Sequence, residues 1–96
     1  MAKGYWITFY RSVSNPEALA EYGKLAGPAI QSGGGRFLVR GTPSRTYEAG
    51  LNERAVVIEF DSLQQAIATF EGAAYQAARK KLQGAAERDI RFLEGS

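Results

Sequence analysis

The chain has 96 residues, of which 45% are hydrophobic, and its 12 basic and 10 acidic side chains leave a formal net charge of +2. It contains no cysteine and no histidine, which excludes disulfides, thiolate nucleophiles, Cys or His zinc sites, His-ligated haem and an imidazole base. The first residues form no apolar signal core, and no stretch is apolar enough to span a membrane, so we expect a cytoplasmic protein without a membrane segment.

Residues 1–96 are expected to form one domain, because a chain of this length has no room for a second. A domain this small leaves much of its surface unburied, so a partner chain that covers apolar area would stabilise it. The only basic run, Arg79-Lys80-Lys81, falls in a helix-like stretch and is typical of a solvated helix face. We therefore expect no nucleic-acid partner.

The first quarter of the chain predicts a strand followed by a helix. Residues 5–10 are aromatic and β-branched, as is typical of a strand. Asn15, Pro16 and Glu17 then indicate a helix start, because Asn caps the first turn, Pro suits the first helical position and an acid complements the helix dipole. Pro28 lacks an amide hydrogen, so we expect this helix to kink or restart at the preceding glycine, Gly27.

The middle of the chain predicts two more strands. Three glycines at 33–35 end the helix, and residues 36–41 form the second strand. A turn at Thr42-Pro43 follows, after which residues 45–48 are expected to continue as an extended arm. Residues 54–60 are rich in Val, Ile and Phe and predict the third strand.

The last third predicts a helix in two segments and a final strand. Ser62 begins the helix, with Gln65 completing a capping box, and Gly72 indicates a break before a further helical segment. Residues 88–94 form the last strand. The order is therefore βαββαβ, which predicts an α+β, ferredoxin-like fold: a four-stranded antiparallel sheet with the helices on one face.

Successive side chains on a strand point to opposite faces, so each strand contributes to both sides of the sheet. The uniformly apolar side is expected under the helices. It comprises Ile7, Phe9, Phe37, Val39, Val56, Ile58, Phe60, Ile90 and Phe92. The other side comprises Trp6, Thr8, Tyr10, Arg36, Leu38, Arg40, Val57, Glu59, Arg91 and Leu93. That side carries too much apolar area for water and too much charge for a dry core, so we predict a homodimer packed sheet on sheet.

Glu59 lies in a strand otherwise made of apolar residues and has two interpretations. It could act as a general base or a ligand-orienting carboxylate, or it could form a structural ion pair with Arg40 or Arg36. The two arginines, predicted to share one face, could clamp a carboxylate or phosphate with their planar forks, or simply neutralise Glu59. Glu59 is therefore the candidate catalytic residue, and it is also a candidate ligand-binding residue.

Aromatic residues complete the predicted site. Trp6 and Tyr10 could form the wall of a ligand pocket or anchor the dimer interface. Tyr75 lies on the apolar stripe of its helix and is expected in the core, with its hydroxyl reaching a polar partner. The candidate ligand-binding residues are thus Arg36, Arg40, Glu59, Trp6, Tyr10 and Tyr75, and we expect no metal and no cofactor.

Five segments together carry a family resemblance: residues 3–7, 15–17, 34–41, 53–60 and 93–95. With them, nearly the whole chain resembles the bacterial family called domain of unknown function 1330. The resemblance implies the dimeric α/β-barrel superfamily, in which two ferredoxin-like protomers pack sheet on sheet. Its wider relatives include cofactor-free monooxygenases, haem-degrading enzymes, lactone isomerases and ligand-sensing domains, so it implies a fold and no single activity.

The functional expectation is a homodimer that binds a small organic anion between the sheet and the helices. Two alternatives remain open. One is a cofactor-independent monooxygenase-like or isomerase-like enzyme with Glu59 as its base. The other is a non-catalytic structural or sensing module whose polar sheet face serves only dimerisation.

Overall fold

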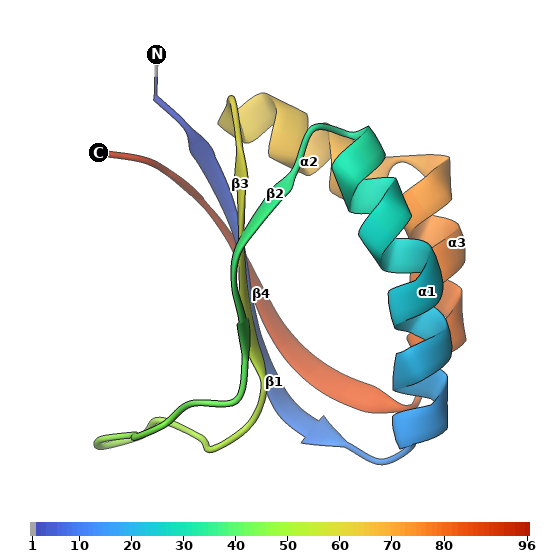
Figure 1. Cartoon of the computed structure of the whole chain (residues 1–96), viewed down its shortest axis with the longest axis vertical. Helices are drawn as coiled ribbons and strands as arrows, with labels where there is room; N and C mark the ends of the chain where they lie inside the picture. The colour runs from blue at the N-terminus through green and yellow to red at the C-terminus, as the bar shows by residue number, and fades with distance from the viewer. Residues whose placement is uncertain (1) are drawn as a thin grey trace.

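The computed structural model describes residues 2–96, and Figure 1 shows a sheet with its helices on one side. The strands are β1 (Gly4–Val13), β2 (Arg36–Gly41), β3 (Ala55–Phe60) and β4 (Ala86–Glu94). The helices are α1 (Pro16–Ser32), α2 (Leu63–Glu71) and α3 (Ala73–Leu82). The predicted βαββαβ order is confirmed, with the second helical unit divided into α2 and α3.

The strands lie in the order β2-β3-β1-β4, and every neighbouring pair is antiparallel. This is the ferredoxin-like arrangement that the order of elements predicts. The helices cover one face of the sheet, and no described segment covers the other, which we call the open face (Figure 1). The two faces therefore have different environments, and the placement of each side chain depends on which one it joins.

The start of α1 follows from its sequence. The side-chain oxygen of Asn15 accepts hydrogen bonds from the backbone N–H groups of Glu17 (3.1 Å) and Ala18 (3.2 Å). Pro16 occupies the first helical position, where its missing N–H leaves no bond unmade. The predicted cap is confirmed.

Pro28 lies inside α1, and of the kink or restart predicted near Gly27 the restart does not occur, because the helix continues to Ser32. A proline costs a helix one backbone hydrogen bond, here the one that the carbonyl of Lys24 would accept. Lys24 is exposed, so water can satisfy that carbonyl. The buried face of the helix is continuous across the proline, and its packing on the sheet holds the two halves together.

Gly72 separates α2 from α3, as predicted. Ser62 caps α2 by accepting a hydrogen bond from the backbone N–H of Gln65 (3.1 Å). The side chain of Gln65 does not complete the capping box, because its Nε2 donates instead to the carbonyl of Gly33 (2.7 Å). This bond ties the start of α2 to the end of α1, where Gly34 adopts a left-handed φ of 96° that suits glycine.

The predicted faces of β1 are reversed in the structure. Trp6, Thr8 and Tyr10 face the helices and are buried, whereas Phe9 is 46% exposed on the open face and Ile7 is partly exposed there. Both sides of this strand carry large apolar side chains, so alternation alone does not decide between them. Packing against the helices determines which side of β1 is buried, because the space beneath the helices is filled by the indole of Trp6.

Trp6 is 1% exposed and lies at the centre of an aromatic cluster. Its ring centroid is 4.7 Å from that of Tyr75, 5.3 Å from Phe70, 5.5 Å from Phe92 and 6.3 Å from Phe60. The nearest two rings meet the indole edge to face, the arrangement that aromatic pairs favour. The interpretation of Trp6 as an anchor of a dimer interface is therefore wrong.

A bulge in β2 overturns the prediction that Arg36 and Arg40 share one face. The register against β3 shifts between Phe37 and Val39, so Leu38 is an extra residue and the alternation changes phase there. Arg36 and Val39 join the open face, whereas Phe37 and Arg40 join the helix side. Val39, predicted under the helices, is 58% exposed.

The segment 42–54 between β2 and β3 is an irregular loop that extends beyond the sheet (Figure 1). The extended arm expected for residues 45–48 does not form a strand. Tyr47 at the tip is 72% exposed. Arg40 near the end of β2 and Arg54 just before β3 lie at the same end of their strands, beside the start of α1.

Candidate functional site

A cavity of about 340 Å³ lies between α1 and the helix-facing side of the sheet, and we call it the α1 pocket. Most of its wall is apolar or aromatic, and its only charged residues are arginines. The aromatic residues are Trp6, Tyr10, Tyr22 and Phe37, and the larger aliphatic ones are Leu19, Ile30, Val56 and Ile58. The pocket occupies the region between sheet and helices in which the sequence predicts a ligand.

Three arginines line the α1 pocket, and no acidic residue does. Arg40 comes from β2, Arg54 precedes β3, and Arg88 comes from β4. Within residues 2–96, none of the three forms a salt bridge. The guanidinium carbon of Arg40 lies 4.3 Å from the ring centroid of Phe37. Positive charge gathered in a partly buried place without carboxylates favours an anion.

Arg88 has the most closely defined surroundings of the three. Its Nη1 donates hydrogen bonds to the hydroxyl oxygens of Tyr22 (3.1 Å) and Tyr75 (3.3 Å), which lie 2.8 Å from each other. Its guanidinium carbon is 5.1 Å from the ring centroid of Tyr22 and 5.7 Å from that of Tyr10. Because the two hydroxyls come from α1 and α3, Arg88 lies beneath the contact between these helices.

The polar groups of the pocket are arranged to donate hydrogen bonds. Burial raises the pKa of Tyr22 well above its ordinary value of 10, and it also raises the pKa of Tyr10, so both phenols keep their protons. One hydroxyl hydrogen joins Tyr22 to Tyr75, and either oxygen can be its donor. Thr8 accepts a hydrogen bond from Nε1 of Trp6 (3.1 Å), so its own hydroxyl hydrogen is free. No lining side chain carries a carboxylate or amide oxygen.

Glu59 lies on the open face, away from the α1 pocket. It accepts hydrogen bonds from Nε and Nη2 of Arg36 (both 3.1 Å) and from the hydroxyl of Tyr5 (2.9 Å). Arg36 also reaches Asp61 (3.2 Å), which accepts a hydrogen bond from Lys3 (3.2 Å). The hydrogen bonds from Tyr5 and then Arg36 lower the pKa of Glu59, which makes it a weaker base. The interpretation of Glu59 as the ion-pair partner of Arg36 is confirmed.

Three of the predicted site residues, Trp6, Tyr10 and Arg40, come together in the α1 pocket. Tyr75 is in the core, and its hydroxyl reaches polar partners as expected, but it lies behind the pocket wall. Their part in binding a ligand stays a prediction. The structure places them on one side of the sheet, which is the requirement for acting together.

Arg36 and Glu59 do not line that pocket, so the expectation that they meet Arg40 in one site between sheet and helices is corrected. The bulge in β2 is the physical cause, because it sends the two arginines to opposite faces. Sequence reasoning also missed Arg88, although a signal was present. Arg88 lies two residues before Ile90, and residues two apart on a strand share a face.

The acidic residues of the described chain, residues 2–96, are dispersed rather than clustered. Asp89 is paired with Arg91 (2.9 Å), and Glu87 lies 3.5 Å from Arg11. No group of three potential ligands could hold a metal ion in this part of the chain. Nor is any helix in it both long and apolar enough to cross a membrane.

Comparison with known proteins gives a family and a fold. The family model described as domain of unknown function (DUF1330) matches residues 3–96. No curated protein matches the chain. A protein of unknown function from Rhodopseudomonas palustris has a similar structure, with a TM-score of 0.72 and 18% identity, over 96% of this chain and 81% of that one.

Two further solved structures have the same fold. A dimeric ferredoxin-like protein of unknown function from Thermobifida fusca has a TM-score of 0.66 and 16% identity, over 96% of this chain and 90% of that one. A candidate antibiotic biosynthesis monooxygenase from Nitrosomonas europaea has a TM-score of 0.64 and 15% identity, over 97% of this chain and 89% of that one. At such low identity, these likenesses establish the fold alone.

Proposed function

Since the chain belongs to the family described as domain of unknown function (DUF1330), whose description names no activity, we propose a function from the α1 pocket itself. The protein binds a small organic anion that has an acidic group on a flat apolar body. The observation that carries this proposal is Arg88, a half-buried arginine whose polar side-chain contacts are phenol oxygens and which has no carboxylate partner in residues 2–96. An anionic oxygen placed there would gain charge-assisted hydrogen bonds.

The size and wall of the pocket support the same ligand class. A volume of about 340 Å³ suits a small molecule rather than a single inorganic ion. Trp6, Tyr10 and Tyr22 contribute aromatic edges to a wall that suits a flat apolar body, while Arg40 and Arg54 add positive charge to the lining. The polar side chains that line the pocket include three arginines and no carboxylate or amide, so a ligand that supplies acceptors suits it.

Binding rather than turnover is the better supported function, because the pocket lacks a base. It contains no carboxylate, and the chain has no histidine. Tyr22 keeps its proton because burial raises its pKa. Glu59, the predicted base, lies across the sheet and is held as a carboxylate by Tyr5 and Arg36.

The test uses salicylate as a probe anion and salicylamide as its neutral counterpart, each titrated calorimetrically. We expect salicylate to bind at least ~10-fold more tightly, because a hydrogen bond to a charged group contributes roughly 1.5–3 kcal/mol. Arg88→Gln should weaken salicylate binding by a similar factor, and Arg88→Lys should weaken it less because the charge remains. Arg36→Gln makes the same change of charge on the open face and should leave the affinity unchanged.

Two results would contradict the proposal. One is equal binding of salicylate and salicylamide by the native protein. The other is an equal loss of affinity in Arg36→Gln and in Arg88→Gln, since this would indicate a general effect of net charge. Far-UV circular dichroism of each variant establishes that the fold is retained.

The open face supports a homodimer. Phe9, Val39 and Leu93 are each about half exposed, which is a large apolar area for a face exposed to water. Its charged residues already pair within the chain, as Arg91 does with Asp89 (2.9 Å). A second copy can therefore cover this face without burying unpaired charge, and the similar protein from Thermobifida fusca is described as dimeric.

Sedimentation velocity at micromolar concentration tests the dimer. Phe9→Lys should shift the protein to monomer while leaving the protomer folded, because Phe9 is 46% exposed and lies outside the core beneath the helices. Leu25→Lys is the matched control, since Leu25 is 45% exposed on α1, away from the open face, and should leave the dimer intact. A native protein that sediments as a monomer contradicts the proposal.

A further inference from the structure

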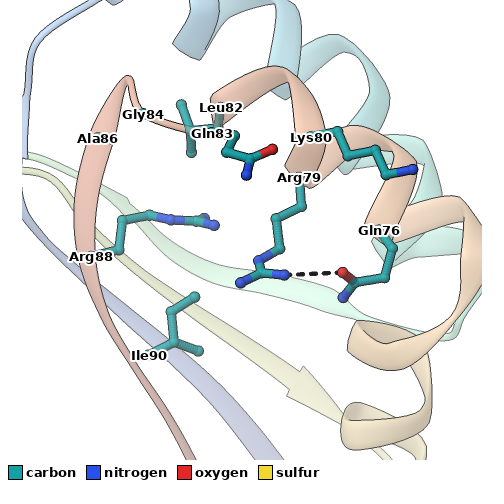
Figure 2. A pocket seen from close by; sticks show the side chains of 9 residues that line it. All are labelled: Gln76, Arg79, Lys80, Leu82, Gln83, Gly84, Ala86, Arg88 and Ile90. Carbon is teal, nitrogen blue, oxygen red and sulfur yellow. Dashed lines mark hydrogen bonds between the residues drawn. The ribbon is translucent and has the colours of Figure 1, made fainter.

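A second cavity, of about 500 Å³, lies between α3 and β4, and we call it the α3–β4 cleft. Figure 2 shows its side chains: Arg79 reaches down from α3, and Arg88 reaches from β4 toward it. Arg88 thus lines both this cleft and the α1 pocket, whereas Arg79 lines only the cleft. The cleft thus gathers guanidinium groups from two different elements, and an anion between them would offset their repulsion.

The charge of the cleft is entirely positive. Arg79, Lys80 and Arg88 line it, and no Asp or Glu does. Within the described residues 2–96, none of these three forms a salt bridge. Gln76 and Gln83 add side-chain amides that can donate further hydrogen bonds. The wall is less apolar and aromatic than that of the α1 pocket, which favours a compact, highly charged ligand over a flat apolar one.

Arg79 is exposed, but its guanidinium group has a defined hydrogen-bond partner. Its Nη1 donates to Oε1 of Gln76 (3.1 Å), the bond drawn in Figure 2. The other end of that amide is also fixed, because Nε2 of Gln76 donates to the carbonyl of Phe70 (2.6 Å). The guanidinium carbon of Arg79 lies 5.6 Å from the ring centroid of Phe70. An anion that binds here would meet an arginine whose conformational entropy is already reduced.

The basic run at the end of α3 has a simpler explanation, which is that three cations complement the negative end of the helix dipole. That explanation applies equally to Arg79, Lys80 and Lys81. It does not account for Arg88 on β4, nor for the anchoring of Arg79 by Gln76. Only part of the run lines the cleft, since Lys81 does not.

We propose that the α3–β4 cleft is a second anion-binding site, which takes a small multivalent oxyanion between Arg79 and Arg88. Lys80 adds charge at its rim. Three positive charges and a cavity larger than the α1 pocket suit a diphosphate or a tricarboxylate rather than a single carboxylate. This proposal does not rest on the proposed binding of an organic anion in the α1 pocket, although Arg88 lines both cavities.

The test is a titration of ¹⁵N-labelled full-length protein, followed by heteronuclear NMR in 0.1 M sodium chloride. Pyrophosphate and citrate are the two probes, and they distinguish a phosphate ligand from a carboxylate one. At least one should cause saturable shifts centred on residues 76–90 and on the side-chain N–H of Arg79. Arg79→Gln should weaken that binding by roughly 10-fold, the loss of one charge-assisted contact.

Lys81→Gln is the matched control, because it removes the same charge from the same helical turn outside the cleft. It should change the affinity by less than about 2-fold, as expected for a screened surface charge. An equal loss in Lys81→Gln and Arg79→Gln would overturn the proposal, as would the absence of saturable shifts with both probes. Arg79→Lys, which keeps the charge without the planar fork, should fall between the native protein and Arg79→Gln.

The two binding proposals can be refuted independently, because different variants test each of them. Arg40→Gln should weaken salicylate and leave the pyrophosphate or citrate titration unchanged, because Arg40 lines only the α1 pocket. Arg79→Gln should weaken the pyrophosphate or citrate titration and leave salicylate binding unchanged, because Arg79 lines only the cleft. Arg88→Gln should weaken both. If Arg40→Gln and Arg79→Gln each weaken both probes, the cleft is not a distinct site.

Discussion

The two faces of the sheet each hold an arginine in a hydrogen-bonded network, but the networks differ in kind. On the open face, Arg36 is paired with Glu59 and Asp61, and Tyr5 completes the bonding of Glu59. On the helix side, Arg88 meets phenol oxygens and no carboxylate in residues 2–96. A paired arginine is neutralised by its own chain, whereas an unpaired one remains available to an anion.

This difference shows why an arginine count is a poor guide to a binding site. Arg36 and Arg40 are four residues apart on one strand, yet of the two only Arg40 lines the α1 pocket. What distinguishes them is the set of carboxylates around each, which depends on strands far away in the sequence. Three experiments on stability test how different the two faces are.

The largest expected effect comes from removing the aromatic centre of the helix side. Trp6→Ala should lower the free energy of unfolding by about 3–5 kcal/mol, because it leaves a cavity among four packed rings. Tyr47→Ala removes a similar ring from the exposed loop and should change it by no more than roughly 0.5 kcal/mol. Urea denaturation followed by circular dichroism measures both. Similar losses of unfolding free energy in Trp6→Ala and Tyr47→Ala would mean that Trp6 is not the core residue described above.

The second prediction concerns alkaline pH and the buried tyrosines. Burial raises the pKa of Tyr22 in the folded protein, whereas the unfolded chain ionises it near pH 10. This stabilisation is therefore complete below pH 10 and is lost as pH rises from there toward the folded pKa. Each such tyrosine should cost about 1.4 kcal/mol of unfolding free energy per pH unit in that range.

Tyr22→Phe should reduce the slope of stability against pH above pH 10, and Tyr47→Phe, at an exposed position, should not. The slope is the relevant measurement, because Tyr22→Phe also removes hydrogen bonds to Tyr75 and Arg88 and so lowers stability at every pH. Equal slopes in the native protein and in Tyr22→Phe would show that Tyr22 ionises as readily when folded.

The smallest effect is expected at acid pH on the open face. The pKa of Glu59 is lowered by Tyr5 and then Arg36, and that of Asp61 is lowered by Lys3 and then Arg36. The stabilisation is present above the ordinary carboxyl values of 4.5 and 3.8 and is lost as pH falls through the lower folded values. Water screens these exposed groups, so the change is modest.

Arg36→Gln should flatten the decline of the urea midpoint between pH 6 and pH 3, and the effect should shrink in high salt. Arg45→Gln, which removes a charge from the exposed loop, is the control and should leave the decline unchanged. If both variants behave alike, the ion pairs of Arg36 contribute nothing specific to the pH dependence.

Much of the fold could be predicted because its signals are local. The cap at Asn15, the break at Gly72 and the apolar strand that ends at Phe60 each depend on neighbours in sequence. The helix does not restart at Pro28, because packing that a local rule does not include stabilises the helix interior. Local propensity is a sound guide until tertiary contacts outweigh it.

The candidate site was harder to predict because it depends on which face each residue takes. In β1 both sides are apolar, so Trp6 and Tyr10 were assigned to the wrong one. In β2 a single extra residue, Leu38, reverses the side of Arg40. The helix-facing position of Arg88 was predictable, since Arg88 lies two residues before Ile90 and residues two apart on a strand share a face. Alternation therefore assigns the residues of a strand to the correct face only when the two faces of that strand differ in polarity.

The sequence by itself determined the order of elements, the absence of histidine and cysteine chemistry, and the family. These depend on residue type and on short-range pattern. Only the tertiary structure decided that Arg36 would be neutralised by Glu59 while Arg88 would lie unpaired between two cavities. The physical reason is that the free energy of a charge depends on the groups within a few ångströms of it. Strand register and helix packing, not neighbours along the chain, bring those groups together.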